Sequence, residues 1–216
     1  MRAMVLALVA VTLGTSLMAV GCASQPSRFY LLSAVPSPET APLGTSTEQG
    51  PTIGVGPVTL PRYLDRPQIV TRTSPYELKL AEFDRWAEAV DANFSRVLAE
   101  NLSFAFPTAR VAVSPWPRST VIDYQVTVDV SYFLSQVGGD SLLIADWTLF
   151  KGDGQEVLRS GRSRVSASPT GQDYAAIVSA MSQTVASLSR EIATTIRGTG
   201  ARVSERRGAS RRPIIP

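Results

Sequence analysis

The feature that constrains the fold most strongly is a strict alternation of apolar and polar residues over 124–133, YQVTVDVSYF. Every second position from Tyr124 to Tyr132 carries a valine or a tyrosine, and polar residues occupy the positions between them. Successive side chains of a strand point to opposite faces of a sheet. This pattern therefore predicts an antiparallel strand with one buried and one solvated face.

Two turn sequences follow this strand and lead into two further strands. GGD at 138–140 precedes SLLIADWTLF, and GDG at 152–154 precedes QEVLRSGRSRVSAS. The apolar side of the first of these segments consists of Leu143, Ala145, Trp147 and Leu149. Trp147 is expected in the core, and the three segments together predict a three-stranded meander.

Two other segments follow the helical period. In residues 84–104 the apolar positions fall on one face, with Asp84 expected to cap the N-terminus and Pro107 to prevent continuation. The sequence TGQD at 170–173 offers a capping box for a second helix. The two apolar stripes comprise Trp86, Val90, Phe94, Val97, Leu98 and Leu102, and then Tyr174, Ile177, Val178, Met181, Val185, Leu188, Ile192 and Ile196.

The first half of the chain also contains strand-like segments before its helix. They are SRFYLL (27–32), TIGVGPVTLP (52–61), QIVTR (68–72) and YELKLAE (76–82). We predict an α+β fold, an antiparallel-rich sheet with two amphipathic helices packed on one face, built from two strand-strand-strand-helix halves. GVGPV at 54–58 lacks the third glycine of a dinucleotide fingerprint, so a strand interrupted by a tight bend is favoured there.

The single cysteine of the chain, Cys22, follows an uncharged apolar segment at 3–20 that is preceded by Arg2. A positive residue, an apolar stretch and small residues are the layout of a secretory signal. The competing interpretation is a transmembrane anchor, but Thr12, Gly14, Thr15 and Ser16 weaken the apolar run and no basic flank follows it.

The four residues AVGC resemble a bacterial lipobox, in which the cysteine thiol is acylated and becomes the mature N-terminus. Lipidation at Cys22 is therefore expected, with a cleaved soluble protein and a signal anchor as the alternatives. Ala23 follows the cysteine, and by resemblance to enterobacterial sorting rules this favours the outer membrane.

Four regions are predicted along the chain. They are a signal peptide at 1–21, a lipidated N-terminus with the first strand and a Pro/Ser-rich spacer at 22–51, a globular domain at 52–197 and an Arg-rich disordered tail at 198–216. The 18 spacer residues 34–51 are expected to behave as a flexible chain. Such a chain reaches about 20 to 25 Å between the membrane and the domain.

Composition excludes several classes of chemistry. The chain has no histidine, and its one thiol is the expected lipidation site. Ser-His-Asp and Cys-His catalysis and most zinc sites require these groups, so we expect no enzyme, no metal and no cofactor. A hydrolase working through Ser/Lys or paired carboxylates is the remaining catalytic alternative, but neither Lys79 nor Lys151 lies in a Ser-x-x-Lys motif.

The excess of positive charge lies in the C-terminal tail. Residues 23–197 hold 15 basic and 17 acidic side chains, whereas 198–216 hold five arginines and one glutamate. The slightly acidic body argues against nucleic-acid binding. The basic tail is either an arm for anionic headgroups or peptidoglycan-associated acids, or a solvated segment without a role.

The loop PRYLDRP at 61–67 is the main candidate for partner binding. It holds Arg62, Tyr63, Leu64, Asp65 and Arg66 between prolines, and Tyr and Arg are enriched in interface hot spots. The alternative is a structural loop in which Asp65 pairs with one of the arginines while Tyr63 and Leu64 pack inward. Trp116, between prolines in SPWP, is a second candidate surface contact.

Several of these segments, in this order, resemble one known family. Cys22, RFYLL, IGVGPVTLPRYLDRPQIVTR and FDRWAEAV look like the PqiC/YmbA family of ABC-type transport auxiliary lipoproteins, over residues 22 to about 197. The resemblance implies a periplasm-facing lipoprotein on the outer membrane. It would act with an MCE-domain protein and inner-membrane permease and ATPase components in moving lipids, and form a homo-oligomeric ring if that partner is a ring. The alternative is a general envelope-structural or peptidoglycan-associated lipoprotein.

Overall fold

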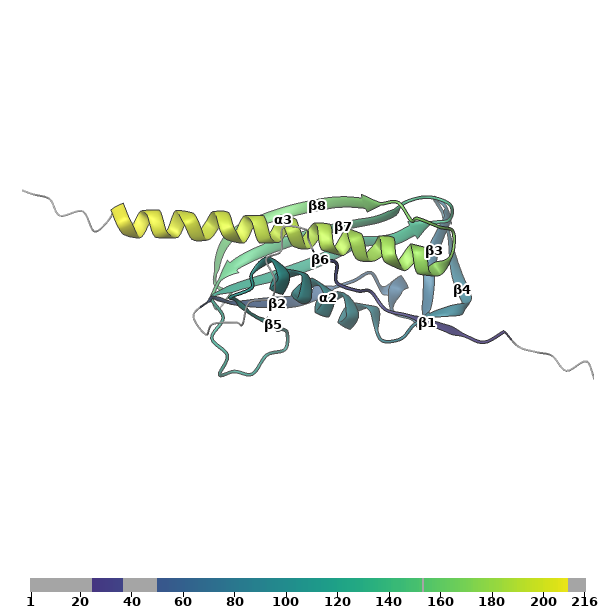
Figure 1. Ribbon diagram of the computed structural model, residues 1–216, viewed down its shortest axis with the longest axis horizontal. Helices are drawn as coiled ribbons and strands as arrows, with labels where there is room; N and C mark the ends of the chain where they lie inside the picture. Colours follow the sequence, from purple (N-terminus) through teal and green to yellow (C-terminus); the bar gives the residue numbers. More distant parts are fainter. Residues whose placement is uncertain (1–24, 37–49, 153, 210–216) are drawn as a thin grey trace, which may run out of the picture.

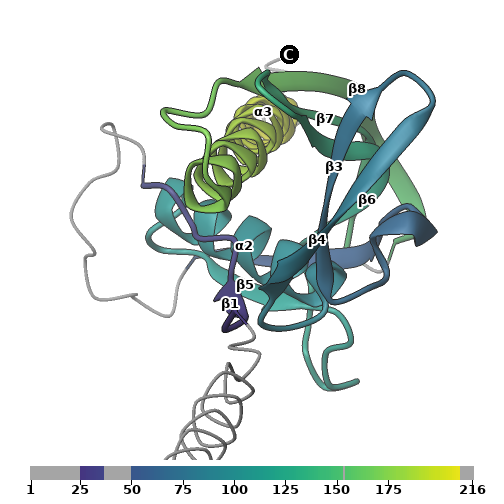
Figure 2. The ribbon, with the colours of Figure 1, turned by 90° about the vertical axis from the view of Figure 1, so that its right-hand side faces the viewer.

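The computed structural model describes residues 25–36, 50–152 and 154–209, with side chains described as far as Thr199. The predicted signal peptide and Cys22 lie outside these residues. The described residues form one eight-stranded mixed sheet with two helices on one face (Figures 1 and 2). The predicted α+β class, with both helices on the same face, is confirmed.

The predicted meander forms the larger part of the sheet. Strands β6 (Tyr124–Gln136), β7 (Ser141–Lys151) and β8 (Glu156–Ala167) pair in antiparallel order. Val126, Val128 and Val130 are buried as the alternation predicts. A register shift between Val130 and Tyr132 then turns Phe133 into the core, and Tyr132 is only half-buried.

The other strands are β1 (Arg28–Tyr30), β2 (Thr52–Thr59), β3 (Gln68–Ser74), β4 (Glu77–Trp86) and β5 (Arg110–Val113). They attach to β6 along its opposite edge, β2 beside its first half and β3 beside its end, and both of these pairings are parallel. Strand β5 pairs with β2 in parallel, β4 pairs with β3 in antiparallel, and β1 pairs with β4 in parallel. The four-residue strand β5 was not predicted, and the bend expected in β2 is present as a register shift between Val55 and Val58.

The first helix begins later than the sequence pattern predicts. Helix α2 spans Val90–Ala105, with Ala89 at its N-cap. Asp84 and Trp86 instead belong to β4, where they align with Arg28 and Tyr30 of β1. The prediction that Asp84 caps this helix is therefore wrong, because pairing with β1 holds residues 84–86 extended. The expected burial of Trp86 is confirmed at 5% exposure.

The second helix, α3 (Tyr174–Ala209), begins after Asp173. The Asp173 carboxylate accepts a hydrogen bond from the Ala176 amide at 2.8 Å, so Asp173 rather than Thr170 caps the first turn. The helix continues beyond residue 198, where a disordered tail was expected, so residues 198–209 are helical (Figure 1).

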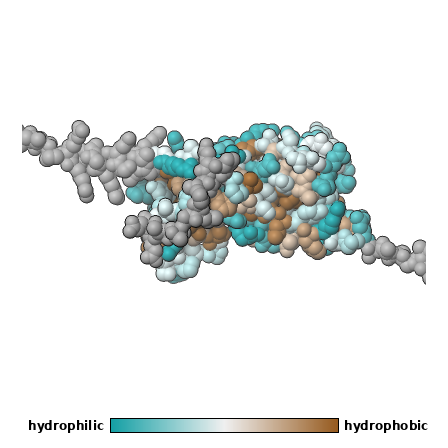
Figure 3. Space-filling view, in the orientation of Figure 1, coloured by the Kyte–Doolittle hydropathy of each residue, from teal (hydrophilic) through white to brown (hydrophobic). Residues whose placement is uncertain are grey.

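The core lies between the sheet and the two helices. Phe94 of α2 meets Phe133 of β6 edge-to-face, with ring centroids 5.3 Å apart and an interplanar angle of 89°. Neither α2 nor α3, within the described residues, is long and apolar enough to cross a membrane. On the face seen in Figure 3, hydrophobic residues gather in patches over the middle of the body.

A short extended segment after β1, residues 32–35, crosses both helices. The Leu32 amide donates to Asn93 Oδ1 of α2 at 2.7 Å, and the Val35 amide donates to Asn101 Oδ1 at 2.9 Å. Between them, the Ser33 amide donates to Ser182 Oγ of α3 at 3.1 Å. The first strand and the beginning of the expected spacer are therefore attached to the globular domain, and only residues before 28 separate the domain from Cys22.

Candidate functional site

The loop at 61–67 folds into a tight turn between β2 and β3. Residues Arg62–Leu64 form one turn of 3-10 helix, closed by a hydrogen bond from the Leu64 amide to the Pro61 carbonyl at 2.9 Å. The Asp65 amide donates to the Arg62 carbonyl at 3.1 Å. The prolines at both ends restrict the backbone further, so the loop presents its side chains from a defined conformation.

Two side chains of this loop point inward. Leu64 is 2% exposed and belongs to the core, and Tyr63 is half-buried against the core. Burial raises the pKa of the Tyr63 hydroxyl, and a hydrogen bond with the Phe133 backbone opposes this effect. Tyr63 and Leu64 therefore hold the loop to the sheet.

The three charged side chains of the loop point outward. Arg62, Asp65 and Arg66 are exposed, and within the described part of the chain none of them forms a side-chain hydrogen bond or ion pair. The Asp65–arginine pair considered from the sequence is thus not formed. These charges remain available for a partner.

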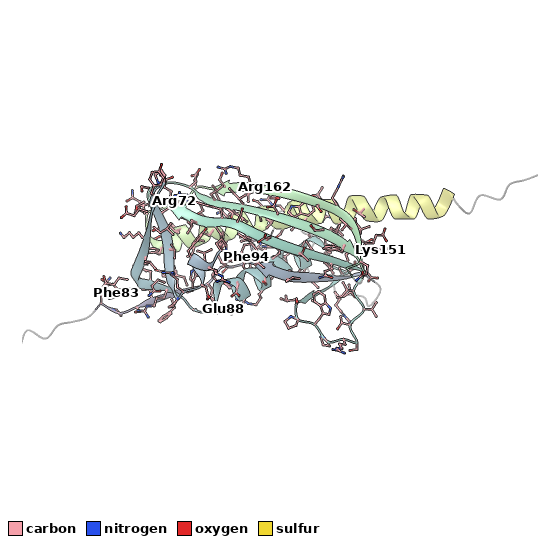
Figure 4. The ribbon with its side chains drawn as sticks, turned by 180° about the vertical axis from the view of Figure 1, so that it is seen from behind. Arg72, Phe83, Glu88, Phe94, Lys151 and Arg162 are labelled. Carbon is pink, nitrogen blue, oxygen red and sulfur yellow. The ribbon has the colours of Figure 1, made fainter. Side chains whose placement is uncertain are left out.

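A cleft of about 650 Å³ lies between this loop and the segment that joins β4 to α2. Its apolar lining includes Val58, Leu60, Leu64, Trp86 and Val90. Its charged lining comprises Arg62, Asp65 and Arg66 from the loop and Glu88 and Asp91 from the opposite side. Figure 4 shows Glu88 in the same half of the molecule as Phe83 of β4, and Lys151 at the other end.

Trp86 connects the two walls of this cleft. Its backbone amide donates to the Pro67 carbonyl at 2.7 Å, which ties the end of β4 to the end of the loop. The indole N–H is buried and has no hydrogen-bond partner among the described residues. An unpaired buried donor costs free energy, and this N–H is closed off from the surface of the cleft.

The side of the cleft opposite the loop begins helix α2. Its N-cap, Ala89, supplies no side-chain hydrogen bond to the first turn, and the Asp91 carboxylate accepts one from the Ala92 amide at 2.8 Å. Glu88 forms an ion pair with Arg96 on α2. Acidic groups on this wall face basic ones on the loop, so both signs of charge border the apolar floor.

Trp116 lies at a separate place. It lines another cleft, of about 730 Å³, together with residues that include Val121, Ile122 and Lys151. Its ring packs on Gly54 of β2, where a Cβ atom would come within 2.9 Å of the indole. The two clefts share no lining residue, so the structure does not bring Trp116 together with the loop at 61–67.

The cleft beside the loop has the character of a binding site. An apolar floor with a charged border suits an amphipathic segment, whose apolar groups face inward and whose polar groups meet the border. Among the described residues, no group of His, Cys, Asp and Glu side chains is arranged to hold a metal ion.

Sequence reasoning identified one wall of this cleft and missed the other. The loop was recognised from its prolines, arginines and tyrosine. Trp86, Glu88 and Asp91 were assigned to a helix starting at residue 84, so their position opposite the loop was not anticipated. The segment FDRWAEAV at 83–90, which contains Trp86 and Glu88, marks the region in sequence, but only the tertiary structure places it against Pro67.

Comparison with known proteins assigns the chain to a family. A family model for the ABC-type transport auxiliary lipoprotein component matches residues 30–193. The chain belongs to this family. The resemblance to PqiC-like proteins stated from the sequence is thereby confirmed. Members of the family are auxiliary lipoproteins of transport systems in the cell envelope, and the family is not one of known enzymes. No curated protein matches the chain.

Solved structures share the fold with this family member. A protein of uncharacterized function is similar with a TM-score of 0.65 and 22% identity, over 80% of this chain and 99% of its own. XCC0632 from Xanthomonas campestris, a DUF330 protein, has a TM-score of 0.64 and 20% identity, over 82% of this chain and 99% of its own. PelC from Paraburkholderia phytofirmans, solved as a dodecamer, reaches a TM-score of only 0.37 at 16% identity, over 67% and 89% of the two chains. That likeness says nothing about assembly here.

Proposed function

We propose that this chain is a lipoprotein acylated at Cys22 that faces the periplasm from the outer membrane. It acts with an MCE-domain protein and with inner-membrane permease and ATPase components in moving lipids across the envelope. The family match supports the transport role, AVGC supports the anchor, and Ala23 supports the outer membrane. The observation that carries the proposal is the family match over 164 residues, from 30 to 193.

The cleft beside the loop at 61–67 is the proposed contact with the transport partner. Arg62, Asp65 and Arg66 border an apolar floor without side-chain partners within the described residues, and an apolar centre with a polar rim is the usual composition of a protein interface. The protein would thus be a binding component and not a catalyst. Trp116 is a second, separate candidate contact.

The test is cross-linking of the lipidated protein in native membranes, followed by purification and mass spectrometry. We expect an MCE-domain protein among the strongest partners, cross-linked near residues 62–66. A variant with Arg62→Ala, Asp65→Ala and Arg66→Ala loses its charged contacts with the partner. We expect this loss to cost about 1.4 kcal/mol of binding free energy, so that about tenfold less partner is recovered.

The matched control replaces two exposed arginines of β8, Arg159→Ala and Arg164→Ala, and should recover the partner normally. Recovery of peptidoglycan or unrelated outer-membrane proteins alone would contradict the transport role and favour a structural envelope lipoprotein. An equal loss of partner recovery in the loop variant and in the β8 control would contradict the assignment of the cleft as the contact with the partner. Recovery of the partner by a Trp116→Ala variant, measured in the same assay, tests the second candidate contact separately.

A further inference from the structure

Strand β1 is held firmly at one end of the body. Arg28 Nε forms an ion pair with Asp84 Oδ1 at 2.9 Å, and the Tyr30 hydroxyl donates to the same carboxylate oxygen at 2.8 Å. The Asp84 side chain is 8% exposed and the Arg28 side chain 55% exposed, so the carboxylate is shielded from water while the guanidinium faces it. With the β4 pairing and the Leu32–Asn93 bonds, the chain is fixed to the domain from Arg28 onward.

The chain available to separate this end from the membrane is short. Only five residues, 23–27, lie between Cys22 and Arg28. Fully extended, this stretch spans about 20 Å from one Cα to the other. Helix α3, with 36 residues, is about 54 Å long and runs along the body away from this end (Figure 1). The domain is therefore much longer than its tether, and the β1 end stays next to the bilayer.

This end carries apolar side chains that face solvent. Phe29 is 64% exposed and Leu31 is 44% exposed, whereas Leu32 is 1% exposed. Phe29 and Leu31 are two positions apart in an extended segment, so they project to the same side. Arg85 aligns with Phe29 across the parallel pair and adds a cation beside them.

β1 is also an edge strand. Within the described residues it pairs with β4 alone, and its other edge meets no strand. A bilayer interface accommodates such an edge, because phosphate and glycerol oxygens accept hydrogen bonds, apolar side chains enter the acyl boundary and arginine meets anionic headgroups.

We propose that the end of the domain formed by β1 and the last residues of β4 rests on the phospholipid surface, with Phe29 and Leu31 in its interfacial layer. This orientation rests on the acylation of Cys22 proposed above. It gives the body a defined direction, with α3 pointing away from the membrane. The cleft that Trp86 and Ala87 line lies directly beside the contact, because the Ala87 amide donates to the Tyr30 carbonyl at 2.9 Å.

The test uses the full, acylated chain with Phe29→Cys, labelled with the environment-sensitive dye NBD. Acylation removes the Cys22 thiol, so the new cysteine is the only thiol available for the label. In vesicles of phosphatidylcholine, with and without phosphatidylglycerol, we expect the emission to shift to shorter wavelength. Lipids with a doxyl quencher near the headgroup should reduce its intensity.

The matched control is Val157→Cys, a position 57% exposed on β8. Val157 aligns with Phe150, next to Lys151, at the end opposite Phe83 in Figure 4. Its label should remain in water, with neither shift nor quenching.

Three results would overturn the inference. If the protein binds the vesicles but the Phe29→Cys label shows no more shift or quenching than the Val157→Cys label, the orientation alone is overturned. A shift that needs no vesicles and grows with protein concentration assigns the β1 edge to a second copy of the chain. A mature N-terminus without acyl chains, shown by mass spectrometry together with failure to float with vesicles, overturns the anchor and this orientation together.

Discussion

Trp147 on β7 lies opposite Gly161 on β8, and the absence of a side chain on the glycine leaves room for the indole ring. The indole N–H donates to Ser163 Oγ at 2.9 Å, and the Ser163 hydroxyl in turn donates to Glu191 of α3. One aromatic residue thereby joins two strands and a helix. Its position depends on a small residue across the sheet, which the alternation of β7 alone does not reveal.

Gly161→Ala should destabilise the protein by about 1–3 kcal/mol, the usual cost of overpacking. The new Cβ would lie 2.4 Å from Trp147 Cζ2, so the ring must move and lose its hydrogen bond to Ser163. Urea unfolding measures the change. The control is Gly198→Ala in α3, where a Cβ meets nothing within 4 Å. It should stabilise by up to about 1 kcal/mol through helix propensity. Equal effects of the two substitutions would contradict this account.

At the scale of elements, the segment at 32–35 connects both helices to the first strand. Asn93 is 1% exposed and uses its side chain to accept from the Leu32 amide and donate to the Leu32 carbonyl. Ser182 accepts from the Ser33 amide and donates to the Val178 carbonyl of its own helix. Polar residues on otherwise apolar helix faces thus satisfy the backbone of a segment that has no strand partner there.

Asn93→Ala should cost about 1–3 kcal/mol of stability, because it leaves the buried Leu32 backbone groups unpaired. It should also speed hydrogen exchange at the Leu32 amide more than at amides of β7. Ser182→Ala removes one bond at the exposed Ser33 and should cost only about 0.5–1.5 kcal/mol. The account fails if the Leu32 amide exchanges at the same rate in the Asn93→Ala variant and the unaltered protein.

At the scale of the whole molecule, the two ends of the body differ in what they carry. β1 and the hairpin of β3 and β4 occupy one end, and the last turns of α3 extend beyond the other (Figure 1). Under the proposed anchor, the last turns of α3 lie on the side of the body away from the membrane (Figure 1). A contact between these turns and the headgroups of that same membrane does not fit this arrangement.

The stability of the whole domain should fall in alkaline solution. Burial raises the pKa of Tyr30, Tyr63 and Tyr174, so the folded protein keeps protons that the unfolded chain loses above its ordinary tyrosine pKa of about 10. Their contribution is complete below about pH 10 and is lost as the pH rises through the raised values. Urea midpoints measured from about pH 8 to about pH 11 test this, and Tyr63→Phe should reduce the slope. An unchanged slope in Tyr63→Phe would exclude Tyr63 as a contributor.

The elements that the sequence predicts correctly are those whose signal is local. The period of two in β6 and β7 and the period of 3.6 in α3 each follow from which side of one element faces the core, so neighbouring residues suffice to predict them. The same holds for the loop at 61–67, whose prolines and charges are contiguous, and for the expectation of lipidation at Cys22, which depends on the residues around it.

Contacts between segments that are distant in sequence follow from the three-dimensional fold alone. Residues 84–86 have a helical pattern, yet pairing with β1, more than 50 residues earlier in the chain, holds them as a strand. That pairing accompanies the contact of Trp86 with Pro67 beside the cleft, and it brings Phe29 next to the last residues of β4. Such contacts depend on the register between strands far apart in sequence, and a local pattern carries no information about that register.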